Sequence, residues 1–132
     1  MSKYYCDGST YKNGQVGQDS SFLVLGPRGG ITRKHLGNYS INYAELSAIK
    51  YACKKAKLGD TVYSDSKIAL NWVTTYHTGK KQNFYIDLVK EINNIVHVKG
   101  LSLEYIPRDY NLAGIEIEEC PFYESTKPMW YK

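Results

Sequence analysis

Short apolar stretches separated by turn residues occupy the first third of the chain. The stretches predict strands at residues 3–6, 22–25 and 31–36. Between the first two strands lies a turn-rich segment from Asp7 to Ser20, in which Asn13-Gly14 is a hairpin signal. Residues 26–30 turn the chain again before the third strand. We therefore expect three antiparallel strands.

From Asn42 the apolar positions follow a helical period. They form one face made of Ala44, Leu46 to Ala48, Ile49, Ala52, Cys53 and Ala56, and Lys50, Lys54 and Lys57 lie on another. Gly59 is a stop signal for this helix. The remaining pattern predicts a strand at 61–64, helices at 66–75 and 84–96, a strand at 101–106 ended by Pro107, and a last helix that begins near Asn111 or Leu112 and ends at Cys120-Pro121.

This order of elements predicts an α/β fold, with a five-stranded mixed sheet whose first three strands are antiparallel and with helices on both faces. At 132 residues the chain has the length of one domain. We expect a single domain over 1–132, with a core at about 3–119 and an aromatic C-terminal tail at 120–132.

Composition narrows the class of protein only a little. The formal charge of +4 is modest and matters only if acidic residues collect in one pocket, which would leave the rest of the surface basic. The three cysteines, Cys6, Cys53 and Cys120, are odd in number and widely spaced, which argues against a disulfide framework and a zinc site. With no apolar signal region and no long apolar run, we expect a cytoplasmic, monomeric protein with no membrane partner.

Three carboxylates stand at strand ends or helix starts. Asp7 follows the first strand, Glu45 opens the first long helix, and Asp65 follows the fourth strand. The first and fourth strands are natural neighbours in this arrangement and the helix packs over them, so the three acids are expected to converge at one end of the sheet. Divalent metal relieves the repulsion between such carboxylates, and two ions can activate water against a phosphodiester. Phosphodiester hydrolysis follows as the expected reaction class.

Each acid also has an ordinary structural interpretation. Asp7-Gly8-Ser9 is typical of a turn, Glu45 of a first-turn helix acid with Asn42 as the cap, and Asp65 of a cap for the helix from Ser66. Their joint occurrence, in this order and on these elements, favours the metal site over these alternatives.

At this point the chain resembles the ribonuclease H family of type 1. The resemblance rests on four motifs: YYCDGS with Asn13 six residues after Asp7, Ser40-x-Asn42-x-x-Glu45, Tyr63-Ser64-Asp65-Ser66, and Pro107-Arg108-x-x-Asn111. They cover about residues 3–118 in the family's order. The chain is similar to a short form of the family, with Asn-Leu-Ala-Gly in its last motif.

The resemblance implies a role for each matching residue. Asp7, Glu45 and Asp65 match the catalytic carboxylates, which hold two Mg²⁺ ions, or Mn²⁺ as a substitute. Asn13 and Ser40 match residues that grip a phosphate of the DNA strand, and Asn42 matches a reader of the minor groove near the RNA 2′-hydroxyls. Further substrate contacts are implied for the following residues: Gly8, Ser9, Ser66, Arg108 and Asn111.

The last motif departs from the family, because Ile115 stands where a fourth acid is common. Glu118 lies one helical turn further on, and we take it as the fourth catalytic and metal-binding residue, with Glu116 second. Both acids have an alternative interpretation as solvent-facing residues of a short helix.

Two other features of some relatives are missing. None of His35, His77 and His97 lies in the loop where many members carry a mobile histidine; Arg108 is a candidate for contacting the scissile region, or an ordinary surface arginine before a turn. A long basic protrusion is also absent. Gly79 to Gln82, with Trp72 before it, is the one candidate for touching a hybrid, although a loop with two lysines is usually only solvated.

The resemblance implies a ribonuclease H-like fold and endonucleolytic hydrolysis of the RNA strand of RNA/DNA hybrids, with 5′-phosphate and 3′-hydroxyl products. Two alternatives stay open. One is a non-catalytic module of the same fold that binds hybrid or double-stranded RNA, which Ile115 and the missing histidine favour. The other is a nuclease of the same superfamily that acts on DNA, against which Asn42 and Glu45 argue.

Overall fold

The computed structural model describes residues 2–10, 19–75 and 82–113 of the chain. Its strands form one five-stranded mixed sheet in the order β3-β2-β1-β4-β5. The strands are β1 (Lys3–Thr10), β2 (Asp19–Leu25), β3 (Ile31–Asn38), β4 (Thr61–Ser64) and β5 (Ser102–Tyr105). β1 to β3 are antiparallel, whereas β4 runs parallel to both β1 and β5. The predicted sheet, with its antiparallel first three strands, is confirmed.

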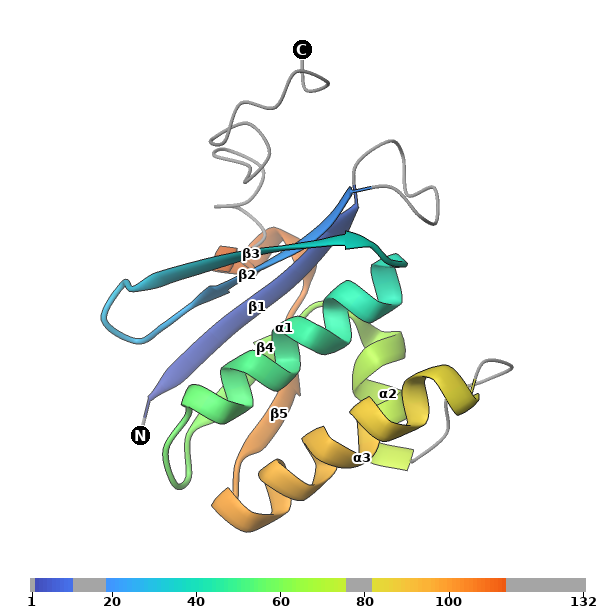
Figure 1. Cartoon of the computed structure of the whole chain (residues 1–132). Helices are drawn as coiled ribbons and strands as arrows, with labels where there is room; N and C mark the ends of the chain where they lie inside the picture. Colours follow the sequence, from blue (N-terminus) through green and yellow to red (C-terminus); the bar gives the residue numbers. More distant parts are fainter. Residues whose placement is uncertain (1, 11–18, 76–81, 114–132) are drawn as a thin grey trace.

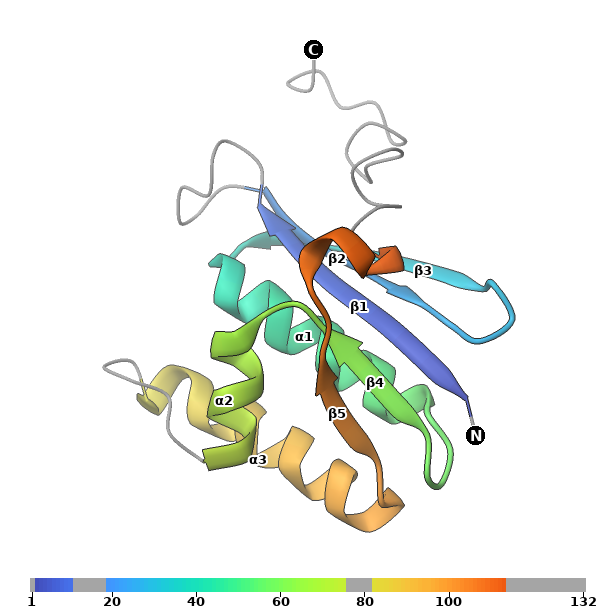
Figure 2. The ribbon, with the colours of Figure 1, turned by 180° about the vertical axis from the view of Figure 1, so that it is seen from behind.

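Within the described ranges, the α-helices α1 to α3 pack on one face of this sheet, as Figure 1 shows. They are α1 (Ile41–Lys55), α2 (Lys67–Thr75) and α3 (Gln82–Lys99). α1 lies across β1 and β2, α3 packs on α1, and α2 contacts α3 and β5. On the other face, seen in Figure 2, the described chain places the short 3₁₀ helix η2 (Arg108–Tyr110) and the first residues of a further helical segment, Leu112 and Ala113.

The two faces of the sheet have separate apolar clusters, because successive side chains along a strand alternate between faces. The larger cluster lies under the helices, where Cys6, Val24 and Val62 meet Leu46 and Ile49 of α1. The smaller cluster joins Leu23 to Ala113, with Tyr5 and Leu25 beside them. The sheet is therefore held from both sides, and its central strand β1 is fixed between two packed layers.

The periodicity of α1 predicted its packing correctly. Every apolar residue assigned to its inner face is buried, including Ala44, Ala52 and Cys53, whereas Ser47 and Lys50 are only partly buried. Within the described ranges, no helix has the length and apolarity needed to cross a membrane.

Candidate active site

Asp7 lies within β1 rather than after it. The strand continues to Thr10, and Asp7 and Gly8 pair with Leu23 and Phe22 of β2. The prediction that the strand ends at Cys6 and that Asp7-Gly8-Ser9 begins a turn is therefore wrong. Turn-forming residues are strand residues here because the ladder to β2 and the packing of α1 above them outweigh local propensity.

Glu45 reaches this strand from α1. The N-cap of α1 is Ser40, whose Oγ accepts a hydrogen bond from the Tyr43 backbone N–H, so the predicted cap at Asn42 is wrong. Glu45 lies beyond the first helical turn, and its Oε1 accepts a hydrogen bond from the Gly8 backbone N–H at 3.1 Å. It is thus not a first-turn acid placed for the helix dipole.

Glycine is required at position 8 because α1 lies directly on the strand there. A Cβ at Gly8 would lie 2.6 Å from the Glu45 backbone nitrogen and 2.7 Å from the Ala44 carbonyl carbon. Both are backbone atoms and cannot rotate away. The missing side chain therefore lets α1 bring Glu45 against β1.

Asp65 comes from the end of β4. Cys6 of β1 pairs in parallel with Ser64 of β4. The residues that follow them, Asp7 and Asp65, therefore lie side by side. The helix that follows is capped by Ser66, whose Oγ accepts from the Ala69 backbone N–H. Asp65 is therefore not the cap of α2, which overturns its ordinary structural interpretation.

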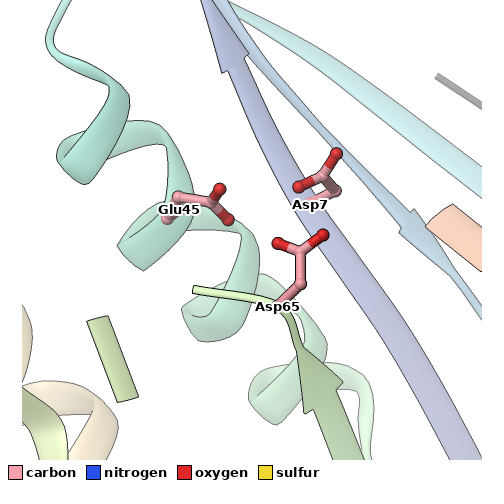
Figure 3. Close-up of side chains that lie close together, drawn as sticks. All are labelled: Asp7, Glu45 and Asp65. Atoms are coloured by element: carbon pink, nitrogen blue, oxygen red, sulfur yellow. The ribbon is translucent and has the colours of Figure 1, made fainter. Parts of the chain in front are cut away.

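The three carboxylates meet at one point, as Figure 3 shows. One oxygen each from Asp7, Glu45 and Asp65 lies within 4.8 Å of the other two. Asp7 and Glu45 are each 8% exposed, and Asp65 is half-buried. We call these residues the acidic triad. Residues that are far apart in sequence are brought together by the β1–β4 pairing and by the contact of α1 with Gly8.

Burial and mutual repulsion disfavour the charged forms of Asp7 and Glu45. Burial is the largest cause that raises the pKa of Asp7, to about 8, and the Asp65 charge adds to it. Burial, followed by the charges of Asp7 and Asp65, raises the pKa of Glu45 well above its usual range. The Arg108 charge lowers both pKa values, but it does not outweigh the other two causes.

The chemistry of these donors fits a hard divalent cation. Carboxylate oxygens at this mutual distance can share a cation whose remaining ligands are water or phosphate oxygens. Within the described ranges, the acidic triad is the group of potential ligands that is close enough together to hold a metal ion.

The other predicted site residues within the described ranges differ in burial and in their contacts. Ser40 sits at the start of α1, where its Oγ is 2.7 Å from the Tyr85 hydroxyl. Asn42 is half-buried in the first turn of the same helix. The Ser9 hydroxyl lies 3.1 Å from that of Ser21, and Arg108 is exposed on η2.

Asn111 is placed differently from a substrate-binding residue. It is fully buried; its Nδ2 donates to the Cys6 carbonyl at 3.0 Å and its Oδ1 accepts from the Ala113 N–H at 3.1 Å. The sequence implied a substrate contact for Asn111. We propose instead that Asn111 positions the chain around Asp7. Its amide ties the residue before Asp7 to the start of the last helical segment.

Several predicted residues lie outside the described ranges. Among them are Asn13, the two candidates for a fourth acid (Glu116 and Glu118), Ile115, His77, the loop at 79–81, Cys120 and the tail at 120–132.

Sequence reasoning missed the two contacts that position the acids, from Gly8 to Glu45 and from Asn111 to Cys6. A glycine directly after a strand carboxylate is a signal for the first contact. For the second contact the sequence holds no comparable signal, because nothing in the sequence distinguishes a buried asparagine from an exposed one.

A mixed sheet in the order β3-β2-β1-β4-β5, with carboxylates gathered where β1, β4 and α1 meet, defines a ribonuclease H-like nuclease when it is taken together with the family match. The chain belongs to the RNase H family, since residues 2–107 match the family model described as RNase H. Members act on nucleic acid and generally use divalent metals. The match contains the acidic triad and ends before Asn111. No curated protein matches the chain.

Proposed function

We propose that this protein is a ribonuclease H of type 1 that hydrolyses the RNA strand of RNA/DNA hybrids endonucleolytically, leaving 5′-phosphate and 3′-hydroxyl ends. The observation that carries the proposal is the convergence of Asp7, Glu45 and Asp65 to within 4.8 Å in a chain of the RNase H family. The type is proposed because all three carboxylates come from the elements that the sequence motifs assign to them.

We further propose that the acidic triad, together with Glu118, holds two Mg²⁺ ions, for which Mn²⁺ can substitute. When bound, the ions lower the pKa of a water molecule and stabilise the leaving oxygen of the phosphodiester. The residues of the chain hold this geometry: the Gly8 N–H fixes one oxygen of Glu45, and the parallel β1–β4 pairing sets Asp65 beside Asp7.

Recognition of the hybrid is assigned to residues at the start of α1. Asn42 and Glu45 lie on this segment, where an amide and a carboxylate can hydrogen-bond 2′-hydroxyls across a minor groove. The Ser40 and Tyr85 hydroxyls, together at the same helix end, support a grip on a phosphate of the DNA strand, to which Asn13 also contributes. Further substrate contacts are proposed for Gly8, Ser9, Ser66 and Arg108, as the sequence motifs imply.

The experiment is a panel of end-labelled substrates in Mg²⁺: RNA/DNA hybrid, double-stranded RNA and duplex DNA of one sequence. Cleavage of only the RNA strand of the hybrid, abolished by a chelator and by Glu45→Gln, is the expected result. Binding of hybrid without cleavage at any metal concentration would favour a non-catalytic module. Equal cleavage of duplex DNA would favour a DNA nuclease of the superfamily.

Single-domain organisation, a monomeric state and a cytoplasmic location remain predictions from the sequence.

A further inference from the structure

A cleft of about 220 Å³ opens on the side of α1 that faces away from the triad. Its walls carry three aromatic rings and three lysines: Phe22, Tyr43, Tyr51, Lys34, Lys50 and Lys54. Tyr43, Ser47, Lys50 and Lys54 are spaced three or four residues apart on α1, and Tyr51 lies four residues after Ser47, so the five share one side of the helix. Glu45, two residues after Tyr43, projects from the opposite side. We call this feature the α1 cleft.

The charge of the α1 cleft is positive. Glu91 of α3 pairs with both Lys50 and Lys54, at 3.1 and 3.4 Å, so a single carboxylate serves two ammonium groups. Lys34 adds a third ammonium group, 5.8 Å from the centre of the Tyr51 ring, and Lys55 approaches that ring at 5.7 Å. Like charges gathered in one place repel one another, and an anion bound among them relieves that repulsion.

The aromatic walls of the cleft indicate that its ligand also has a flat ring. Tyr43 is stacked on Tyr39, with ring centres 4.2 Å apart, and Phe22 lies tilted against Tyr51 at 5.8 Å. Aromatic surface between lysines suits a ligand that has a flat ring and a phosphate, since bases stack on aromatic side chains while lysines follow the backbone. The volume is below the usual range for a pocket that encloses a whole ligand, so it leaves room for the base of one nucleotide and not for a whole cofactor.

We propose that the α1 cleft binds one nucleotide of a single-stranded nucleic acid extending from the substrate of the triad. The choice of a nucleic acid rests on the proposed function, because one helix carries both Glu45 and the cleft, and Tyr43 at the cleft's end lies near the start of α1. A hybrid with a single-stranded tail is then held at two places: the duplex part at the triad and the tail along the outer face of α1.

The first test is binding of a short oligothymidylate in the presence of a chelator, measured by fluorescence anisotropy. Lys34→Gln/Lys54→Gln removes two exposed ammonium groups, and the surface salt bridge that it breaks contributes little to stability. We expect about fivefold weaker binding and a salt dependence reduced by about 1.4 in the logarithmic slope. Tyr51→Leu should weaken binding while leaving the salt slope unchanged, because it removes a stacking surface and no charge.

The matched control is Lys3→Gln/Lys90→Gln, which removes the same charge from exposed positions outside the cleft. This control should bind oligothymidylate within twofold of the unaltered protein. An equal loss in both double variants would mean that net charge alone attracts the strand, and no loss in Lys34→Gln/Lys54→Gln would also overturn the proposal.

The second test separates the cleft from the cleavage reaction. Lys34→Gln/Lys54→Gln should cut a blunt hybrid at the unaltered rate, whereas the KM for a hybrid with a single-stranded tail should rise about fivefold. A rise in KM of the same size for the blunt hybrid would contradict a separate tail site. If the protein cuts no hybrid, the proposed function fails, but the oligothymidylate measurement still decides whether the cleft binds a single strand.

Discussion

The short strand β4 has an aspartate just before it and another just after it, and the protein treats the two in opposite ways. Asp60, before the strand, is 4% exposed and is matched by donors: its two oxygens accept hydrogen bonds from the backbone N–H groups of Ser2 and Lys57, both at 2.9 Å. Asp65, after the strand, faces two other carboxylates. We call the start of β4 the satisfied end, because Asp60 there has hydrogen-bond donors for both oxygens. We call the other end the crowded end, because Asp65 there faces other acids.

The pKa values of Asp60 and of the two carboxylates that Asp65 faces shift in opposite directions. Backbone hydrogen bonds from Ser2 and Lys57 lower the pKa of Asp60, whereas burial and neighbouring carboxylates raise the pKa of Asp7 and Glu45. A carboxylate that ties the chain together is stabilised in its charged form. Carboxylates that gather to hold a cation are destabilised in their charged form when no cation is bound. The triad therefore lowers the stability of the metal-free fold and keeps a site that metal can occupy.

The largest expected effect is on catalysis at the crowded end. Asp65→Asn keeps the shape of the side chain but removes a charged ligand, so hydrolysis of a labelled hybrid in Mg²⁺ should fall by about a thousandfold or more. Asp87→Asn, an exposed position on α3, is the matched control and should cut at the normal rate. Near-normal cleavage by Asp65→Asn would remove Asp65 from the site.

The next effect comes from the contact that brings α1 to the triad. Gly8→Ala places a methyl group against the backbone of Ala44 and Glu45, so α1 must move away from β1. We expect a loss of about 3 kcal/mol in the free energy of unfolding, measured in urea, together with slower cleavage. Gly30→Ala, where a Cβ would meet nothing within 4 Å, should change neither quantity.

A smaller effect on stability, opposite in sign to that of Gly8→Ala, is expected when the repulsion within the triad is relieved. In the chelated protein, a pKa of Asp7 raised to about 8 makes the folded state bind a proton more tightly than the unfolded chain does. Stability should therefore fall as the pH rises from about 4 to about 8. Asp7→Asn removes this charge and should stabilise the chelated protein by about 2 kcal/mol at pH 8, with no gain near pH 3. Destabilisation of an otherwise active Asp7→Asn variant would mean that Asp7 is structural.

The smallest effect is expected at the satisfied end. Asp60→Ala removes the acceptor of two backbone hydrogen bonds and should lower the melting temperature by several degrees without changing the cleavage rate. Since the pKa of Asp60 is lowered, its contribution is present above the usual aspartate pKa and is lost as the pH falls through the folded value. The difference between the variant and the unaltered protein should therefore vanish in acid, which a melting series against pH measures.

The sequence predicted the sheet, its strand directions and the inner face of α1, because apolar periodicity reports which side of an element is buried. It predicted strand and cap positions less well. The predicted first strand ends too early because Asp7, Gly8 and Ser9 are turn-forming residues, whereas tertiary packing keeps them in β1. Ser40 and Asn42 are both good caps, and only the folded helix decides between them.

The meeting of the acids was expected from the sequence, because the first and fourth strands are natural neighbours and the helix packs over them, but the close geometry of the site could not be derived. It depends on the register of β4 against β1 and on the absence of a side chain at Gly8, which are properties of the assembled sheet and helix. The α1 cleft was missed for a related reason. The sequence places Lys50 and Lys54 together on one face of α1, but Phe22, Lys34 and Leu88, which complete the cleft, come from other elements.

Anomalous diffraction from Mn²⁺ in crystals of the protein with a bound hybrid tests the central claim most directly. The predicted result is metal density bounded by carboxylate oxygens of Asp7, Glu45 and Asp65 and by the scissile phosphate of the RNA strand, with Glu118 as a further ligand. Density elsewhere on the chain, or a hybrid bound with no metal among the three carboxylates, would contradict the claim.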